Sequence, residues 1–229
     1  MTERAYMLEL DPLLHSSPVL PALIWAEGIS SPRPTAEVPS FLIEILEQCK
    51  KKGEGFVPAD LRTRVRDMLR HGRYKPAGRG KPASEFLLRA ALSESFPLVN
   101  GPVDINNAIS LASGLPGSIF DADLSGTHLL LRRGRPGESY VFNPAGQVID
   151  LEDLLVVCRR QEESWVPCGN PVKDAMATKI RPETQRVAAI LYAPTDESTD
   201  FVETWAGHYA ELLRTHCRAH VVGFKTGTS

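Results

Sequence analysis

Residues 97–121 read PLVNGPVDINNAISLASGLPGSIFD, a stretch that contains one clear helix and a clear end to it. Apolar residues recur at helical spacing over 101–113, and Gly114 is a residue type that commonly ends a helix. Asn106 and Asn107 stand next to each other inside this helix, although asparagine is a weak helix former. We therefore expect them to face a group that needs amide donors and acceptors. The alternative is a plain polar face or an N-terminal cap.

Working outward, the sequence predicts mainly helices before this stretch and mainly strands after it. Upstream, we expect a strand at 6–10 and an apolar segment at 19–25 that is either a helix or a strand. We also expect helices that begin at Ser40, near Asp60 and at Ser84, the last with Phe86 and Leu87 packed inward. Downstream, we expect strands at 127–133, 140–143, 147–150, 154–160, 187–192 and 221–224, and a helix over 199–217. With no repeat and no long linker, residues 1–229 are expected to form a single domain, with a helical, basic part at 1–95 and an α/β core at 96–229.

The composition is that of a globular protein. The 229-residue chain is 42% hydrophobic and 24% charged, which excludes intrinsic disorder and collagen-like architecture. No apolar run approaches the ~20 residues needed to cross a bilayer, and the N-terminus lacks a basic-then-apolar leader. The four cysteines are irregularly spaced, as expected of reduced thiols. We therefore expect a cytoplasmic protein with no membrane partner, whose oligomeric state the sequence leaves open.

Positive charge is concentrated in one part of the chain. Residues 50–89 contain twelve Lys and Arg against four Asp and Glu, although the whole chain has a net charge of -2. Arg62, Arg66 and Arg70 fall one turn apart on the polar face of the helix near Asp60, and the loop 71–82 adds four more cations among glycines and prolines. Such a concentration favours a polyanionic partner, the alternative being a solvated helix face beside a basic loop.

The common catalytic and cofactor motifs are absent. The sequence has no P-loop, G-x-G-x-x-G, H-E-x-x-H or G-x-S-x-G motif, and we expect no cofactor. His208, His216 and His220 fall at helical spacing and make a metal site conceivable, but no acidic or cysteine pair accompanies them, so we predict no metal. Cys158 and Cys168 are candidate nucleophiles, but no basic partner is identified near either in the sequence. We therefore interpret them as buried, unreactive thiols.

The succession of motifs resembles the editing module, the B3/B4 domain, of the phenylalanyl-tRNA synthetase beta subunit of bacteria. The resemblance covers nearly the whole chain and rests on the run 97–121, then 129–135, a hairpin at 137–142, and the segment TKIRPETQRV at 178–187. The upstream segments 74–76 and 84–92 are similar to freestanding members of that family. No aminoacylation domain fits into the remaining residues.

This resemblance implies an α+β fold, with a mixed two-sheet core flanked by helices, and a pocket that receives the 3' end of a tRNA. It implies catalytic roles for Asn106, Asn107 and Ser118. Ser118 stands where the synthetase has a histidine that orders the attacking water, and Ile190 stands where it has a glutamate that reads a tyrosine hydroxyl. The implied pocket residues are Asn100, Asp104, Gly117, Asp121, Thr178, Lys179 and Ile190.

The activity implied is hydrolysis, in trans, of the ester that joins a wrong amino acid to a tRNA. An aminoacyl ester is already activated, so a positioned water and donors for the oxyanion suffice. We expect an aminoacylated tRNA as partner and no DNA. The expected RNA contacts are Arg62, Arg66, Arg70, Arg73, Lys75, Arg79, Lys81 and Lys173. Two alternatives stay open: an inert module that binds tRNA or aminoacyl groups, and a small-molecule enzyme that reuses the pocket.

Overall fold

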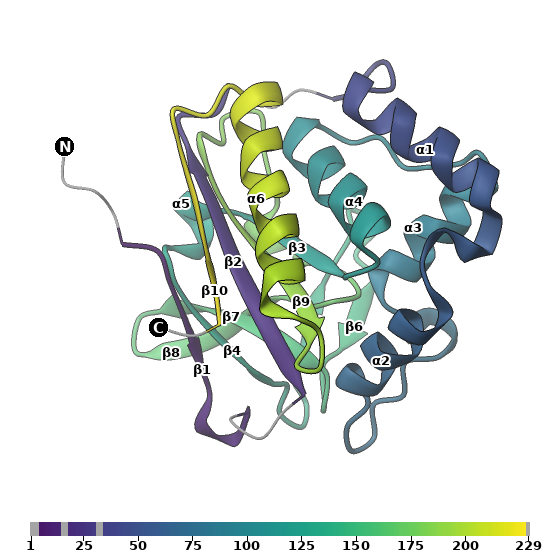
Figure 1. The fold of residues 1–229 in the computed structure, drawn as a ribbon. Coiled ribbons are helices and arrows are strands. Elements are labelled where there is room, and N and C mark those ends of the chain that lie inside the picture. Colours follow the sequence, from purple (N-terminus) through teal and green to yellow (C-terminus); the bar gives the residue numbers. More distant parts are fainter. Residues whose placement is uncertain (1–4, 15–17, 31–33, 228–229) are drawn as a thin grey trace.

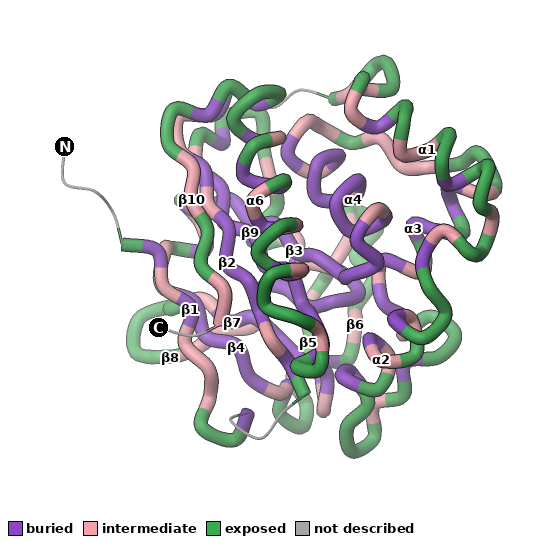
Figure 2. The backbone as a smooth tube through the Cα atoms, viewed as in Figure 1, coloured by how far each residue is buried: buried purple, intermediate pink, exposed green. Residues whose placement is uncertain are grey.

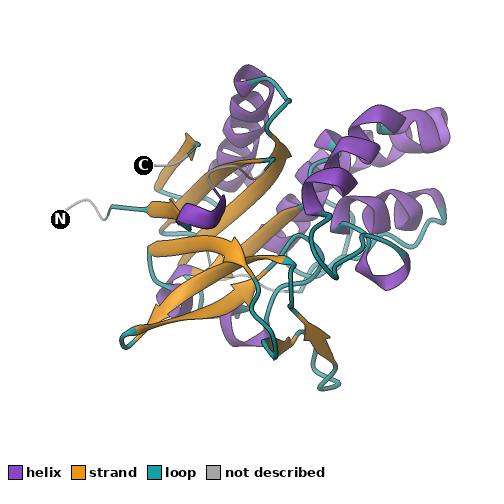
Figure 3. Cartoon of the chain, turned by 90° about the horizontal axis from the view of Figure 1, so that it is seen from below, coloured by secondary structure: helices purple, strands orange, loops and turns teal. Residues whose placement is uncertain are grey.

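The computed structural model describes residues 5–14, 18–30 and 34–227, and these form an α+β fold. Two four-stranded sheets make the core, a short two-stranded hairpin lies beside them, and helices flank the strands (Figure 1). Seen from below, most of the helices gather on one side of the strands (Figure 3). The predicted α+β class with a two-sheet core is confirmed.

The first sheet has the strand order β10-β2-β9-β3. Its strands are β10 (Val221–Thr226), β2 (Val19–Glu27), β9 (Arg186–Pro194) and β3 (Gly117–Asp121), and every pairing is antiparallel. The inner strands β2 and β9 are largely buried (Figure 2), because neighbouring strands and covering helices leave them little contact with water. This explains why β9 is a continuous apolar run rather than an alternating one.

The second sheet has the order β1-β4-β7-β8 and contains one parallel pair. Its strands are β1 (Met7–Leu10), β4 (His128–Arg133), β7 (Leu155–Gln161) and β8 (Ser164–Gly169), with β1 parallel to β4. The separate hairpin pairs β5 (Ser139–Val141) with β6 (Val148–Asp150). Strands β3 and β8 were not predicted, because their short sequences GSIFD and SWVPCG mix glycine, proline and serine with apolar residues.

Within the described ranges, five longer helices flank the sheets. They are α1 (Ser40–Lys52), α2 (Ala59–Leu69), α3 (Ala83–Leu92), α4 (Gly101–Ser113) and α6 (Thr199–His216), and α5 (Ala122–Ser125) is a single turn. Of these, α1 and α3 pack on α4. The predicted helix 101–113 is confirmed. Asn100 caps it by accepting a hydrogen bond from the Val103 N–H at 3.2 Å, and Gly114 ends it with a φ of 76°.

The predicted division at residue 95 does not separate two structural parts. Strand β2 lies between β9 and β10, and β1 pairs with β4, so the N-terminal part contributes strands to both sheets. The description of 1–95 as helical is therefore incomplete, because long-range pairing rather than local sequence decides where these strands belong. None of the helices within the described ranges is long and apolar enough to cross a membrane.

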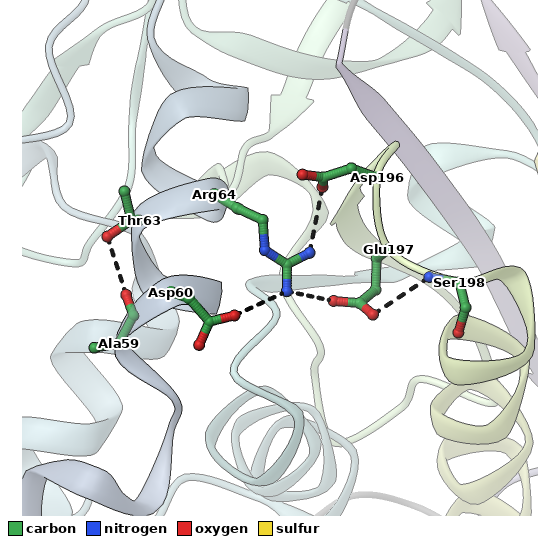
Figure 4. Close-up of polar contacts among 7 residues, drawn as sticks. All are labelled: Ala59, Asp60, Thr63, Arg64, Asp196, Glu197 and Ser198. Atoms are coloured by element: carbon green, nitrogen blue, oxygen red, sulfur yellow. Dashed lines mark hydrogen bonds and ion pairs between the residues drawn. The ribbon is translucent and has the colours of Figure 1, made fainter.

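An ionic cluster fixes α2 against the chain that leads from β9 to α6. The Arg64 guanidinium lies 3.3 Å from Asp196, 3.0 Å from Glu197 and 3.4 Å from Asp60, so three carboxylates surround one cation (Figure 4). Leu61 and Val65, on the same helix, are buried in the apolar core and also hold α2 in place. Helix α2 is thereby held in a defined position.

Candidate functional site

Two adjoining cavities lie among α2, α3, α4 and the segment after β8, and the smaller one reaches the β3 edge of the first sheet. Their volumes are about 990 Å³ and about 170 Å³. Asn107 and Lys173 line both cavities, together with Ala83 and Val172, so the two spaces meet at these residues. We call the first the large cavity and the second the small pocket.

Cationic side chains dominate the wall of the large cavity. They come from α2, from the loop before α3, from α3 and from the segment after β8: Arg62, Arg66, Arg79, Lys81, Arg89 and Lys173, against the carboxylates of Glu54 and Glu85. Arg66 is neutralised, because its Nε and Nη2 atoms both donate to Glu85. Among the residues that the structure describes, the other five cations have no carboxylate within ion-pair distance. The large cavity therefore offers unpaired positive charge to an anionic ligand.

Crowding of like charge is most evident at Lys173. Partial burial lowers the pKa of this amine, and the neighbouring Arg79 lowers it further. Its Nζ atom lies 3.9 Å from the centre of the Phe142 ring, a cation–π contact that holds the ammonium at the junction of the two cavities. An anion bound between Lys173 and Arg79 would relieve their repulsion.

The small pocket is lined by polar groups from three parts of the chain. Asn106 and Asn107 project from α4, Gly117 belongs to β3, and Asp174 and Lys179 come from the segment between β8 and β9. A Cβ atom on Gly117 would lie 2.7 Å from Oδ1 of Asn106, so only glycine fits there without displacing that amide. This close approach brings the sheet edge up to the helix and forms the pocket.

The two asparagines differ in how far they are available to a ligand. The Oδ1 atom of Asn106 accepts a hydrogen bond from Tyr209 at 3.1 Å, and its Nδ2 atom donates to the carbonyl of Gly117 at 3.4 Å. Asn106 is also buried, with 6% of its surface exposed. Asn107 is half-buried and lines both cavities. The Oδ1 atom of Asn107 accepts a hydrogen bond from Nδ2 of Asn106 at 3.5 Å, and its own Nδ2 atom has no partner in the described part of the chain. Asn107 can thus donate to a ligand through Nδ2, while Asn106 holds the wall in place.

Asp174 was not predicted from the sequence, and it is the most distinctive group in the pocket. Its Oδ2 atom accepts a hydrogen bond from the Ile119 N–H at 3.0 Å, whereas its Oδ1 atom is buried with no hydrogen-bond partner in the described chain. Burial raises the pKa of Asp174 to about 6, against the opposing effects of Ser118, the Ile119 N–H and Lys179. A carboxyl with such a pKa changes protonation near neutral pH, as general acid–base groups do.

Ser118 and Ile190 line neither cavity. The Ser118 hydroxyl is fully buried, donates to the carbonyl of Asn170 at 3.2 Å and lies 2.9 Å from the Tyr192 hydroxyl. Ile190 pairs with Ser118 across β3 and β9 and is also fully buried. On β3 the neighbours Gly117 and Ile119 face the pocket, and alternation along the strand turns Ser118 away from it. Ser118 and Ile190 therefore belong to the core, and neither side chain forms part of a cavity wall.

Four further predicted pocket residues have structural partners and lie outside both cavity walls. Asn100 caps α4, and Asp104 accepts hydrogen bonds from Thr35 and from the Val99 N–H. Asp121 accepts from Thr184 and from the Asp123 N–H, and Thr178 donates to the carbonyl of Cys168. These contacts hold the start of α4, the end of β3 and the segment after β8, which explains those residues without assigning them to a ligand. Of the predicted pocket residues, Gly117 and Lys179 line the small pocket.

The Arg and Lys residues predicted to contact RNA also fall into two groups, inside and outside the wall of the large cavity. Arg62, Arg66, Arg79, Lys81 and Lys173 line the large cavity. Arg70, Arg73 and Lys75 do not: Arg70 lies 3.5 Å from Asp67, Arg73 lies 2.9 Å from Glu152, and Lys75 donates to the carbonyl of Gly72. Arg70, Arg73 and Lys75 follow one another at the end of α2 and the start of the next loop, and the chain returns to the cavity wall from Gly78 onward.

The cysteines are buried, free thiols. Burial raises the pKa of Cys158 to about 12 and raises that of Cys168 well above its ordinary value. Both thiols are therefore protonated at neutral pH and are poor nucleophiles. In the described ranges, no group of three or more His, Cys, Asp or Glu side chains is placed to hold a metal ion. His208 and His216 pack against Trp205 and Phe41.

The chain belongs to the B3/4 domain family, whose match extends over residues 77–199. This range contains α3, α4, β3 and the segment with Lys173, Asp174 and Lys179, and thus most of the walls of both cavities. Family membership confirms the resemblance seen in the sequence motifs.

Among solved structures, the chain is similar to an N-terminal fragment of the phenylalanyl-tRNA synthetase beta-subunit from Pyrococcus horikoshii. The identity is 10% and the TM-score is 0.47, with 93% of this chain and 49% of that fragment covered. The chain thus spans about half the length of the fragment it matches.

Proposed function

We propose that this protein binds the aminoacylated 3' end of a tRNA and hydrolyses the ester of a mischarged amino acid. The observation that carries the proposal is the junction of the two cavities at Asn107 and Lys173. A cationic space suited to phosphates opens there into a small polar pocket suited to an ester. Membership of the B3/4 domain family and the resemblance to the synthetase editing module support the same activity.

In the proposed reaction, Asp174 is the general base. Its carboxylate takes a proton from a water molecule while the water oxygen bonds to the ester carbonyl carbon. Asn107 and Lys179, both in the pocket wall, donate to the oxyanion that forms. The bond from that carbon to the ribose oxygen then breaks, and the ribose oxygen takes the proton from Asp174. The products are the free amino acid and a tRNA with its terminal hydroxyl restored.

The test is a deacylation screen over a panel of mischarged tRNAs. We expect the protein to hydrolyse at least one of them and Asn107→Ala to lose most of that activity. A matched control is Asn143→Ala, because Asn143 is a half-buried amide in the turn of the hairpin and lines neither cavity. If no member of the panel is hydrolysed faster than in buffer, the proposed activity is wrong.

An inert tRNA-binding module is the second candidate. It is favoured by the hydrogen bonds that occupy the amide of Asn106 in the pocket wall and by the burial of Ser118 outside both cavities, which leave two predicted catalytic groups unavailable to a substrate. The same screen separates the two functions, because an inert module binds the tRNA and leaves every ester intact.

A further inference from the structure

Phe86 is a large aromatic side chain on the exposed face of α3. It is 53% exposed, whereas the next residues, Leu87 and Leu88, are 3% and 4% exposed and fill the core. The prediction that Phe86 packs inward is therefore wrong, because the helix already buries an apolar stripe through the two leucines. Phe86 contributes little to the core and lies instead in the wall of the large cavity.

The surroundings of Phe86 are cationic rather than apolar. Arg89 lies one turn further along α3, with its guanidinium carbon 5.8 Å from the centre of the Phe86 ring. Arg79, Lys81 and Lys173 line the same cavity, and no carboxylate in the described chain pairs with them. A partner that buried Phe86 in an apolar contact alone would also have to desolvate these charges without compensation. The charges therefore favour an anionic occupant.

A ligand that fits this surface must offer both a flat group for the Phe86 ring and negative charge for the surrounding cations. Single-stranded nucleic acid presents flat bases that stack on aromatic rings, joined by phosphates that bind Arg and Lys. The Arg89 guanidinium lies over the Phe86 ring, and a base stacked on Phe86 would also be within reach of it, since arginine itself stacks on bases. An exposed aromatic residue among unpaired cations is the arrangement that such proteins use.

We propose that Phe86 is a stacking platform for an unpaired base near the 3' end of the bound RNA, with Arg79, Lys81 and Lys173 contacting the adjoining phosphates. This inference rests on the proposed function and names how the large cavity would hold the RNA terminus. It makes Phe86 a binding residue with no part in the chemistry of hydrolysis.

The test compares the binding of an uncharged tRNA with the binding of the same tRNA trimmed of its unpaired 3' nucleotides. Stacking is worth about 1–3 kcal/mol per base, so Phe86→Ala should weaken binding of the intact tRNA by roughly 5- to 150-fold. Phe86→Trp should keep most of the affinity, because indole also stacks. Phe224→Ala is the matched control, since Phe224 is 38% exposed on β10 and lines neither cavity.

With the trimmed tRNA, the native protein and Phe86→Ala should bind equally. If the native protein binds intact tRNA and Phe86→Ala binds it as tightly, or if Phe86→Ala weakens both RNAs to the same extent, the stacking inference is wrong and the proposed function stands. If the native protein binds neither RNA, both fail. If instead Phe86→Ala abolishes a concentration-dependent self-association without changing RNA affinity, the surface belongs to a second copy of the chain and the inference is overturned.

Discussion

Replacing Asp174 with asparagine should stabilise the folded protein at pH 8 while abolishing ester hydrolysis. The Asp174 carboxyl lies in the wall of the small pocket, where burial raises its pKa to about 6. A neutral amide of the same shape can still accept the hydrogen bond from the Ile119 N–H that the carboxylate now accepts. The substitution therefore removes the buried charge and keeps the contact.

The magnitude follows from the two protonation equilibria. An ordinary aspartate titrates near 3.8, and the difference from about 6 corresponds to about 3 kcal/mol of disfavoured ionisation in the folded state. Between these two values the folded protein binds more protons than the unfolded chain, so the stability of the native protein falls as pH rises through this window. Because Asp174 retains some exposure at the pocket wall, we expect Asp174→Asn to gain about 1–3 kcal/mol at pH 8 and little at pH 3.5.

The assay is urea denaturation of both proteins at pH 3.5, 5, 6.5 and 8, with hydrolysis followed at pH 5 to 8. Hydrolysis by the native protein should rise with pH through about 6, since the ionised carboxylate is the base. Glu163→Gln, at an exposed carboxylate in the turn between β7 and β8 and outside both cavities, is the control for loss of a carboxylate charge. If Asp174→Asn loses stability at pH 8, or hydrolyses the ester at the native rate, the account of this carboxyl is refuted.

Four other outcomes are expected. Gly117→Ala should abolish hydrolysis and lower stability by about 1–3 kcal/mol, because its Cβ would lie 2.7 Å from Oδ1 of Asn106; activity assays and denaturation check both. Raising salt from about 50 to about 200 mM should weaken RNA binding roughly 50-fold if four phosphates are neutralised, and a flat response in a filter-binding titration would contradict the cationic cavity. Glu138→Ala should cost about 3 kcal/mol on denaturation, because it leaves the guanidinium of Arg132, which is 2% exposed, without its two 2.7 Å contacts to this carboxylate. Arg64→Ala should cost only about 1 kcal/mol, less in high salt, since its ion pairs are partly exposed; a larger loss in the same denaturation assay would show that it does more than join α2 to the chain before α6.

The local elements of the fold were largely predictable. Helix α4 has its capping asparagine at Asn100 and its terminal glycine at Gly114, and both signals act within one turn of the residues they affect. Helix α6 follows an apolar repeat with a period of three and four residues. Strands β3 and β8 were missed because their stability comes from pairing with β9 and β7, which local patterns do not record.

The candidate site was predictable only in part. Asn107 and the cations Arg62, Arg79 and Lys81 were singled out from the sequence, and they line the large cavity. Asp174 escaped notice, because an aspartate in a turn-rich segment resembles any solvated acidic residue. Its role depends on the Ile119 N–H, which lies 55 positions earlier in the chain and approaches it only when the segment after β8 folds over the edge of β3.

The amino-acid sequence by itself determined the helices, the concentration of positive charge in residues 50–89 and the membership of the B3/4 domain family. Only the tertiary structure decided that Ser118 faces the core, that Asn107 is more accessible to a ligand than Asn106, and that Phe86 and Asp174 stand in the cavity walls. The physical reason is the distance along the chain between the residues that determine each property. Helix formation, capping and charge density are set by residues within a few positions of one another. The face that a strand residue presents, and the burial that shifts the pKa of a carboxyl, are set by neighbours brought together from distant parts of the chain.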